Sequence, residues 1–244
     1  MNSVRGDESA RSENSVDIIV PSYNEHAVVA LCIKRIFDSF KNTNFDYTVI
    51  VVLDGPDDEA LVALTELNSK HLKVVQLETN RGKGAALRSG IQISKARFVA
   101  FIDADLDIHP DAIRAGLDVL LTNNMVVGAY GSKVHPESDV TYPVSRRLMS
   151  FVFRLFLRLV LQLNVTDSQT GLKVFRSAEL KEVLDKTSED GYLFDLEIMM
   201  LLSRRKHHLI PIPITLDYQF NSSIKVSTAL KIARQGFALR QKVR

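Results

Sequence analysis

The sequence predicts an α/β fold in which a mostly parallel central sheet carries helices on both faces. In the first half of the chain, continuous apolar runs typical of buried strands alternate with segments of helical periodicity. Strands that are apolar along their whole length are buried on both faces, which is the usual environment of a parallel sheet. Polar loops follow all four of these strands, at the edge where parallel sheets bind their ligands.

The predicted elements alternate regularly as far as residue 102. Strands are expected at residues 17–21, 47–53, 73–77 and 97–102, and helices at residues 27–40, 59–70 and 83–94. The second half of the chain is less regular. Its expected elements are a helix from Asp111, a long helix at 145–163, a short strand at 172–175, a helix at 195–205 and a proline-broken extended segment at 209–218.

The chain is expected to form one domain with two short extensions. Residues 1–15 are polar and lack the apolar stretch of a signal peptide, so we expect a disordered tail. Residues 16–226 contain no linker, repeat or low-complexity tract, and we expect them to fold as one unit. Residues 227–244 are basic and have helical periodicity, which predicts a basic amphipathic helix.

Composition excludes several classes of protein. The formal net charge of +2 gives no argument for nucleic-acid binding, and no uncharged apolar run approaches the ~20 residues of a membrane-spanning helix. The single cysteine, Cys32, cannot form an internal disulfide, so a reducing cytoplasm fits the sequence best. A buried core thiol is a better interpretation of Cys32 than a nucleophile, because it follows an apolar stretch in the first predicted helix.

The strongest chemical signal is the sequence Asp103-Ala-Asp105-Leu-Asp107, which directly follows the fourth predicted strand. Carboxylates this close raise one another's pKa unless a cation binds between them. Hard oxygen ligands suit Mg²⁺ or Mn²⁺, which proteins often bind through one or two carboxylates and the phosphates of a substrate. One aspartate could instead cap the helix that follows, but three carboxylates at the end of a strand favour a metal site.

A second motif, Asn80-Arg-Gly-Lys-Gly84, opens the helix predicted at 83–94. Two glycines and two cations at a helix N-terminus can face a phosphate group. The spacing is not that of a P-loop, nor that of a dinucleotide-binding fingerprint, because Leu87 stands at the third glycine position. By itself the motif is equally compatible with an ordinary turn in which Lys83 is solvated.

Asp54 ends the second predicted strand. A carboxylate at this place can accept hydrogen bonds from the N–H groups of a nucleobase or from a ribose hydroxyl. An aspartate before Gly55 is equally well explained as a turn-forming residue. Tyr23 and Glu25, after the first strand, are ambiguous in the same way.

Taken together, these loops resemble those of the GT-A fold glycosyltransferases of family two, and within it the polyprenyl-phosphate sugar transferases such as dolichol-phosphate mannose and glucose synthases. The resemblance covers about residues 17–226 and implies a Rossmann-like GT-A fold. The matching stretches are Val20-Pro-Ser-Tyr-Asn-Glu25, Leu53-Asp-Gly55, Asn80-Arg-Gly-Lys-Gly-Ala-Ala86, Asp103-Ala-Asp-Leu106, Asp167-Ser-Gln-Thr-Gly-Leu-Lys173 and Gly191-Tyr-Leu-Phe-Asp-Leu-Glu197.

The resemblance also implies a site for a nucleotide-sugar donor and a divalent ion. Asp103 and Ala104 would contact the nucleotide, while Asp105, with the side chain at Asp107, would hold the metal. The residues that would line the nucleoside are Pro21, Tyr23, Glu25, Val52 and Asp54.

Further along the chain, the resemblance implies contacts with phosphate groups and shows two departures. Lys133 falls where the family usually has an arginine that faces the donor, and Arg146 fits a phosphate-binding arginine. Position 107 is often glutamine in these synthases, and the aspartate here remains a competent oxygen ligand. A late loop of the family often has arginine and, six positions on, lysine. Here Gln219 takes the arginine's place and Lys225 the lysine's, which puts one phosphate contact in doubt.

The expected chemistry is transfer of a hexose with inversion. A divalent ion and cations such as Lys83 or Lys133 would stabilise the departing nucleoside diphosphate while the sugar gains oxocarbenium character. A phosphate acceptor is already anionic near pH 7 and needs no general base, whereas a hydroxyl acceptor usually does. Asp195 and Glu197 are therefore candidates for shaping the site, and are equally well explained as carboxylates in the first turn of a helix.

Two segments, one apolar and one basic, suggest a membrane acceptor. On a helical wheel, residues 145–163 are apolar except for one narrow stripe, so the helix could lie in the membrane interface or be buried in its own domain. Each basic residue near an anionic leaflet is worth ~1 kcal/mol, so the C-terminal segment could localise the protein, or could be a solvated tail. The stripe consists of Arg147, Ser150, Arg154, Arg158 and Gln162, and the basic residues are Lys225, Lys231, Arg234, Arg240, Lys242 and Arg244.

The sequence therefore predicts a metal-dependent glycosyltransferase that transfers a hexose, from a donor such as GDP-mannose or UDP-glucose, to a polyprenyl phosphate. We expect a cytoplasmic protein that associates peripherally with the membrane surface. Transfer to a soluble or polysaccharide acceptor by the same donor chemistry, and a sugar nucleotidyltransferase, are the alternatives.

Overall fold

A computed structural model describes residues 12–140, 158, 163, 165–168, 170–216 and 241 of the chain. Four predictions fall mainly outside the described residues. These are the polar tail as far as residue 11, the helix at 145–163 except for residues 158 and 163, the end of the domain at 217–226, and the basic C-terminal helix except for residue 241.

The described residues form one seven-stranded sheet with the strand order β3-β2-β1-β4-β6-β5-β7. Its parallel pairs are β1 with β2, β1 with β4, β2 with β3, and β5 with β7, whereas β6 runs antiparallel to both of its neighbours. The strands are β1 (Ser15–Ser22), β2 (Asp46–Leu53), β3 (Leu72–Gln76), β4 (Phe98–Phe101), β5 (Val126–Gly131), β6 (Lys173–Arg176) and β7 (His208–Ile212).

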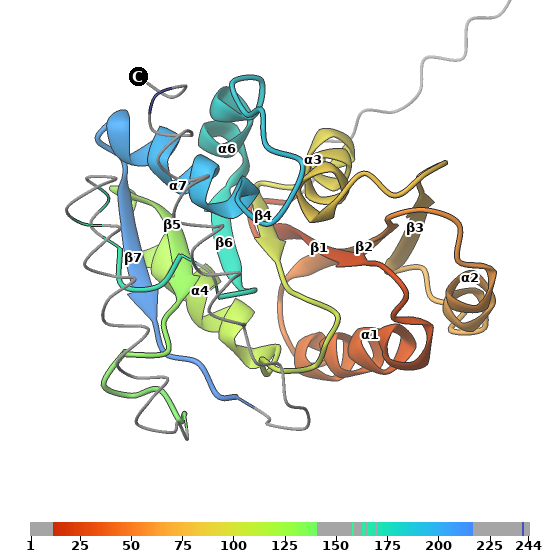
Figure 1. Cartoon of the computed structure of the whole chain (residues 1–244). Coiled ribbons are helices and arrows are strands. Elements are labelled where there is room, and N and C mark those ends of the chain that lie inside the picture. The colour runs from red at the N-terminus through yellow and green to blue at the C-terminus, as the bar shows by residue number, and fades with distance from the viewer. Residues whose placement is uncertain are drawn as a thin grey trace, which may run out of the picture.

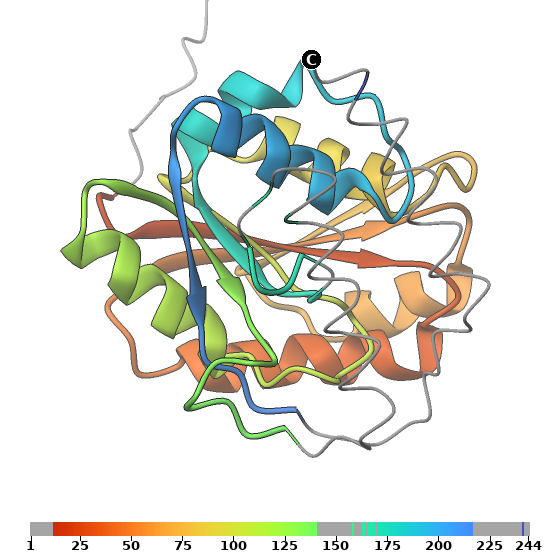
Figure 2. The same cartoon turned by 60° about the vertical axis from the view of Figure 1, so that its left-hand side comes forward.

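Helices cover both faces of the sheet (Figures 1 and 2). One face carries α1 (His26–Phe40), α2 (Asp58–Thr65) and α4 (Asp111–Thr122), and the other carries α3 (Lys83–Ile93), α6 (Ser177–Leu184) and α7 (Phe194–Arg204). The predicted fold class, a mostly parallel sheet with helices on both faces, is confirmed.

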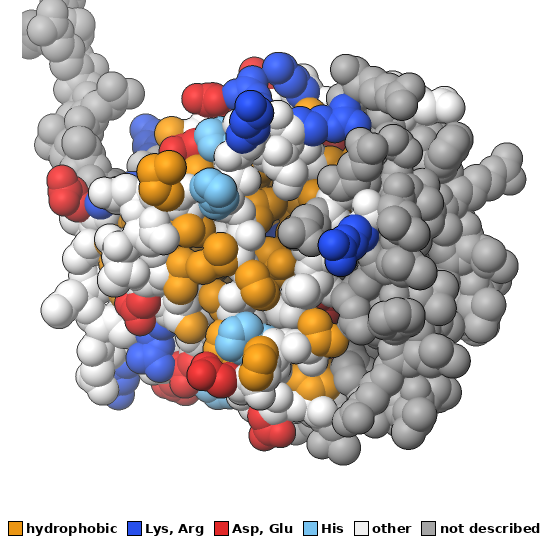
Figure 3. All heavy atoms as spheres, turned by 90° about the vertical axis from the view of Figure 1, so that its left-hand side faces the viewer, with side chains coloured by type: hydrophobic (Ala, Val, Ile, Leu, Met, Phe, Trp, Pro, Cys, Tyr) orange, Lys and Arg blue, Asp and Glu red, His pale blue; other side chains and the backbone are white. Residues whose placement is uncertain are grey.

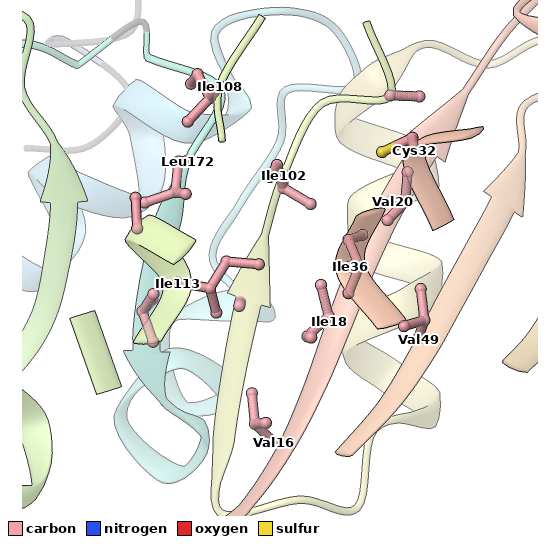
Figure 4. Packing of buried hydrophobic residues seen from close by; sticks show 14 of the residues in the cluster. Val16, Ile18, Val20, Cys32, Ile36, Val49, Ile102, Ile108, Ile113 and Leu172 are labelled. Atoms are coloured by element: carbon pink, nitrogen blue, oxygen red, sulfur yellow. The ribbon is translucent and has the colours of Figure 1, made fainter. Parts of the chain in front are cut away.

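The alternation of side chains along the central strands builds a core on each side of the sheet. Ile18 and Val20 of β1 pack with Ile36 and Cys32 of α1 on one face, as Figure 4 shows. Ile19, which points the opposite way, packs with α3 on the other face. Because both faces are covered, β1 is buried along its whole length, which explains the apolar run at residues 18–21.

The structure differs from the sequence prediction at three elements. Helix α2 ends at Thr65, earlier than expected, and Asn68 then takes a left-handed backbone conformation in the turn that follows. Strand β5 was not predicted, because Gly128 and Gly131 weaken its strand pattern although all six of its residues are buried. Helix α6 was not predicted either, since it starts directly at the end of β6.

Strand β7 forms one edge of the sheet, and Figure 3 looks directly at this edge. Hydrophobic side chains gather at the centre of this view. Pro211 lies within the strand and Pro213 follows it, and proline has no backbone N–H to donate. The edge is therefore poorly suited to pairing with a further strand. No helix in the described part of the chain has the length and apolar character needed to cross a membrane.

Candidate active site

The sheet brings three of the predicted polar loops together at one edge. Strands β2, β1 and β4 are neighbours, with Ser22 opposite Leu53 and Ile19 opposite Phe101. The backbone N–H of Asp54 donates to the carbonyl of Ser22 at 2.8 Å, so the loops after β1 and β2 start side by side. The loop that begins at Asp103 leaves β4 on the other side of β1.

The direction of β6 adds a fourth segment to this edge. Because β6 runs antiparallel to β4, its first residue, Lys173, lies opposite Phe101, the last residue of β4. The turn before β6 therefore reaches the loop of Asp103. A Cβ atom added to Gly171 would overlap the Asp103 side chain, so only glycine allows this close approach.

Lys83 and Asp103 form the central ion pair of the site. Lys83 Nζ lies 2.5 Å from Asp103 Oδ1, and the two side chains are 18% and 31% exposed. Burial alone would raise the pKa of Asp103, but the positive charges of Lys83, Lys173 and Lys133 more than offset it and hold the pKa below its ordinary value. The lysine predicted to be either phosphate-facing or solvated thus points at the first aspartate of the predicted metal motif.

A second carboxylate, Asp195, extends this pair into a chain of alternating charges. Asp195 Oδ2 lies 3.6 Å from Lys83 Nζ and 3.2 Å from Lys173 Nζ. Lys173 is only 1% exposed, and its ammonium also donates to the carbonyl of Thr170 at 2.5 Å. Burial lowers the pKa of Lys173, although the charge of Asp195 acts in the opposite direction. We call Asp103, Lys83, Asp195 and Lys173 the charge chain.

Asp105 and Glu25 lie in the negative field of Asp103. Desolvation by the surrounding loops, followed by the charge of Asp103, raises the pKa of Asp105 to about 6. Burial, followed by the charges of Asp103 and Asp105, raises the pKa of Glu25 to about 7. Asp107 adds to the repulsion at Asp105, while its backbone N–H donates to Asp105 Oδ1 at 3.0 Å across the left-handed Leu106.

These carboxylates have the chemistry of a site for Mg²⁺ or Mn²⁺. Hard oxygen ligands and mutual repulsion both favour a divalent cation, which would stabilise the charged form of each group. Within the described residues, no three His, Cys, Asp or Glu side chains are grouped closely enough to hold a metal by themselves. Asp103 and Asp105 fit an ion that takes its remaining ligands from water and from the phosphates of a bound nucleotide.

Asp54 holds the loop that leads into α3 in place. Its two carboxylate oxygens accept hydrogen bonds from the backbone N–H groups of Arg81 and Gly82, at 2.7 and 2.8 Å. Gly82 has a φ of 102°, and a Cβ atom at this position would overlap the carbonyl of Asp190. The loop can therefore enter α3 only with glycine at this position. Asp54, which is 4% exposed, holds the loop through its two hydrogen bonds.

Helix α3 is also joined to the loop before α7. Arg88 of α3 donates to Asp190, to the Thr187 hydroxyl and to the Glu189 carbonyl. Glu197, which is 1% exposed, accepts hydrogen bonds from the backbone N–H groups of Ser188 and Glu189 at 2.9–3.0 Å. Glu197 therefore stabilises the loop before α7, whereas Asp195, in the same turn, belongs to the charge chain.

The other predicted site residues differ in how far they are accessible. Tyr23 is 53% exposed beside the site, whereas Pro21 and Val52 are buried neighbours in the paired strands β1 and β2. The Ala104 side chain is packed in the core, so any contact with a ligand would have to come from its backbone. Lys133 is half-buried, close enough to lower the pKa of Asp103. Arg146 and Lys225 lie outside the described residues.

Cys32 is a buried thiol, as predicted. It is 2% exposed, and its Sγ lies 3.9 Å from the carbonyl oxygen of Asp103, directly beneath the carboxylate loop. Burial, and then the negative charges of Asp105, Glu25 and Asp103, raises its pKa to about 12. A thiol in this state is not a nucleophile at neutral pH.

Comparison with known proteins identifies the family. Residues 17–184, more than half of the chain, match the family model described as glycosyl transferase family 2. The chain belongs to this family. The polar loops after β1, β2, β3 and β4, which carry most of the site described above, all fall within the matched residues.

Curated relatives of this family 2 protein act on polyprenyl phosphates, as their names state. It is 29% identical over 206 residues to the dolichyl-phosphate beta-glucosyltransferase of Drosophila melanogaster, covering 78% of this chain and 63% of the relative. It is 26% identical over 232 residues to the undecaprenyl-phosphate mannosyltransferase of Micrococcus luteus, covering 91% of this chain and 94% of the relative. The chain thus spans less than two thirds of the Drosophila protein.

Solved structures confirm the GT-A fold. Mannosyl-3-phosphoglycerate synthase from Rubrobacter xylanophilus matches with a TM-score of 0.69 and 18% identity, covering 93% of this chain and 73% of the other. Glucosyl-3-phosphoglycerate synthase from Mycobacterium tuberculosis, in complex with Mn²⁺, UDP and phosphoglyceric acid, matches with a TM-score of 0.68 and 17% identity, covering 94% and 78%. At these identities the likeness concerns the fold.

Lys173 and Arg88 were not predicted to be parts of the site. Lys173 had a detectable signal, since it interrupts the apolar run Leu172-Lys-Val-Phe175, and a lysine in a buried strand requires a carboxylate partner. Arg88 had none, because its partners at 187–190 lie about a hundred residues further along the chain.

Proposed function

We propose that this family 2 glycosyltransferase transfers a hexose from a nucleotide sugar to a polyprenyl phosphate, with inversion at the anomeric carbon. The observation that carries this proposal is the charge chain beside Asp105, where carboxylates suited to a divalent ion lie next to lysines suited to phosphate oxygens. A donor that leaves as a diphosphate needs both kinds of group.

On the donor side, Tyr23 offers an exposed aromatic ring for the nucleobase, next to the strand ends that carry Pro21, Val52 and Asp54. Asp103 and Asp105, with Asp107, would hold Mg²⁺ or Mn²⁺, which when bound neutralises charge on the departing diphosphate. Lys83 keeps Asp103 ionised and ready to bind a cation.

Lys133 supplies a further positive charge from the loop after β5. Its position near Asp103 suits contact with a donor phosphate, and a cation in a partly desolvated site stabilises developing negative charge more strongly than one in water. Arg146 and Lys225 are proposed as additional phosphate contacts on the basis of the family resemblance alone.

On the acceptor side, a lipid phosphate fits the arrangement of the site. A phosphate monoester is anionic near pH 7 and attacks without losing a proton to the enzyme. The carboxylate that could serve as a base, Asp195, already lies beside two ammonium groups, which favours an electrostatic and orienting role. The names of the Drosophila and Micrococcus relatives support a polyprenyl phosphate as this acceptor.

We further propose that the protein works at the cytoplasmic face of a membrane, to which it binds peripherally. The basic segment 227–244 and the apolar segment 145–163 support this proposal by composition. Deleting residues 231–244 should then move protein from the membrane fraction to the supernatant. An unchanged distribution would remove the tail from the proposal.

The decisive experiment is a transfer assay with purified full-length protein in detergent and Mn²⁺. Radiolabelled UDP-glucose and GDP-mannose are offered separately, with undecaprenyl phosphate or dolichyl phosphate as the acceptor. We expect label to enter the organic phase with one of the donors. The matched control is the corresponding polyprenol, which lacks the phosphate and should accept no sugar.

Two results would redirect the proposal. Label that appears only in a water-soluble product, for example with 3-phosphoglycerate as acceptor, would favour a soluble acceptor. Formation of sugar nucleotide from sugar phosphate and nucleoside triphosphate, with release of pyrophosphate, would identify a nucleotidyltransferase instead.

A further inference from the structure

Asp195 is a buried carboxylate with only one of its two oxygens in use. Oδ2 faces both Lys83 and Lys173, while Oδ1 is buried and has no hydrogen-bond partner in the structure described here. A buried polar atom without a partner costs free energy, and native proteins contain few of them. An unpaired oxygen on a residue at the edge of a catalytic site is a place where a ligand can bind.

The arrangement of Lys173 determines which oxygen of Asp195 stays unpaired. Its ammonium bridges Asp195 Oδ2 and the carbonyl of Thr170, at 3.2 and 2.5 Å. This bridge joins the start of α7 to the turn before β6, whose Gly171 packs on Asp103. The Thr170 hydroxyl is likewise buried without a partner among the residues that the structure describes.

The cost of burying Lys173 indicates a role beyond packing. A fully buried ion pair usually contributes no more stability than apolar side chains of similar size would. The other buried residues of β6 are apolar, and Phe175 lies on the same face of the strand as Lys173, so a methionine or leucine would fit at this position. The lysine instead gives Asp195 a fixed partner on one side.

We propose that Lys173 is a positioning residue for sugar transfer: it anchors Asp195 Oδ2 so that Oδ1 can accept a hydrogen bond from a hydroxyl of the bound hexose. This inference rests on the proposed function and adds a residue to the site. Lys173 acts through Asp195 and not by contact with the substrate. Because a displacement of about 1 Å in a catalytic group can cost about 100-fold in rate, losing the anchor should lower kcat strongly.

The test is a double-mutant cycle in the transfer assay, on full-length protein. Lys173→Met should lower kcat by about 100-fold and leave the KM for the donor within about threefold, because the missing interaction matters mainly in the transition state. Lys173→Arg, which keeps the charge but changes its geometry, should recover at least about tenfold of that loss. Asp195→Asn should also be slow, since the amide replaces one carboxylate oxygen by a hydrogen-bond donor.

The combination of the two changes separates positioning from structure. If Lys173 acts only through Asp195, adding Lys173→Met to Asp195→Asn should change kcat by less than about threefold. The double variant loses one charge of each sign, so the comparison remains possible even if Lys173→Met alone does not fold. The matched control is Lys181→Met, which removes an ammonium that donates to the backbone carbonyl of Ser94, away from the carboxylates.

The outcomes distinguish this inference from the proposed function. Wild-type transfer together with near wild-type kcat in Lys173→Met, or kcat losses that multiply in the double variant, would overturn the inference and leave the function standing. A Lys173→Met protein that loses thermal stability but keeps its kcat per folded molecule would also overturn it. Wild-type protein that transfers hexose from neither donor would overturn both.

Discussion

The Asp54 carboxylate accepts a hydrogen bond from the backbone N–H of Gly82, and thereby ties the end of β2 to the loop that leads into α3. The other oxygen of the same carboxylate accepts from Arg81. Lys83, which follows Gly82 in the chain, carries the ammonium that contacts Asp103. The position of the ion pair between Lys83 and Asp103 therefore depends on the hydrogen bonds that Asp54 accepts at the end of β2.

Replacement of Asp54 tests this dependence. Asp54→Ala should reduce the free energy of unfolding by about 2–3 kcal/mol, because two backbone N–H groups lose a charged acceptor. It should also weaken nucleotide binding roughly tenfold through the displaced loop.

Asp57→Ala is the matched control: Asp57 caps α2 through the N–H of Ala60, so its loss should cost about 1 kcal/mol and leave nucleotide affinity unchanged. Urea unfolding and calorimetric titration with UDP or GDP and Mn²⁺ give both quantities, and equal affinities in the two variants would contradict the prediction.

The raised pKa of Glu25 predicts a pH-dependent stability. Because the folded-state pKa, about 7, lies above the ordinary value of 4.5, the folded protein holds this proton more tightly than the unfolded chain. The stabilisation is complete below about pH 4.5 and is lost as the pH rises through about 7. Without metal, wild-type protein should therefore lose about 1–3 kcal/mol more unfolding free energy than Glu25→Gln over this range.

Urea unfolding at the two ends of this pH range, in the presence of a chelator, measures the difference for Glu25. Glu66→Gln, at an exposed position in the turn after α2, serves as the control and should follow the wild-type curve. Parallel pH profiles for wild type and Glu25→Gln would show that burial and the charges of Asp103 and Asp105 do not raise the pKa of Glu25.

Removal of the second carboxylate of the metal motif tests the metal. Asp105→Ala should abolish sugar transfer and the stabilisation that Mn²⁺ gives to the nucleotide-bound protein, since bound ligands raise apparent stability. The protein should remain folded without metal, because removal of the Asp105 carboxylate relieves its repulsion with Asp103 and Asp107. Asp118→Ala, on the exposed side of α4, should leave both properties unchanged. Near-normal turnover by Asp105→Ala with Mn²⁺ present would refute the metal role.

Glu197 should be a stability residue with an indirect effect on activity. Glu197→Gln weakens the charged hydrogen bonds to Ser188 and Glu189, and turns one acceptor oxygen into a donor that faces donors. We expect a loss of about 2–3 kcal/mol in unfolding free energy. Glu182→Gln, which breaks only a surface pair with Arg205, should cost less than about 1 kcal/mol. Equal unfolding curves for the two variants would mean that the loop before α7 does not depend on Glu197.

Much of the first half of the structure could be predicted from sequence because its signals are local. The apolar run of β1 predicts a buried strand, and the polar residues from Asp103 predict a loop, from neighbouring residues alone. The three carboxylates after β4 likewise predict a metal site by their spacing alone, and that site stays a prediction. For Asp54, the sequence placed the residue correctly at the edge of the site, whereas its contact with the loop at 81–82 became visible only in three dimensions.

The second half could not be predicted to the same extent, because its contacts are set by topology. Periodicity does not give the direction of a strand, so it could not show that β6 begins beside the end of β4. The approach of Gly171 to Asp103 and the pairing of Lys173 with Asp195 both follow from that direction. Ala104 and Val52 show the opposite difficulty, since residues implied to line the donor site have side chains buried in the core.

Because Cys32 lies beneath the Asp103 loop, the reactivity of its thiol can report how often this part of the site opens. It is the single cysteine of the chain, and its thiol is shielded from solvent and held in the unreactive protonated form. An alkylating reagent can reach the sulfur only when the packing between α1 and the carboxylate loop opens. The rate of alkylation therefore records how often this region opens, and its slowing by a nucleotide and a divalent ion would measure how firmly they close the site without any engineered cysteine.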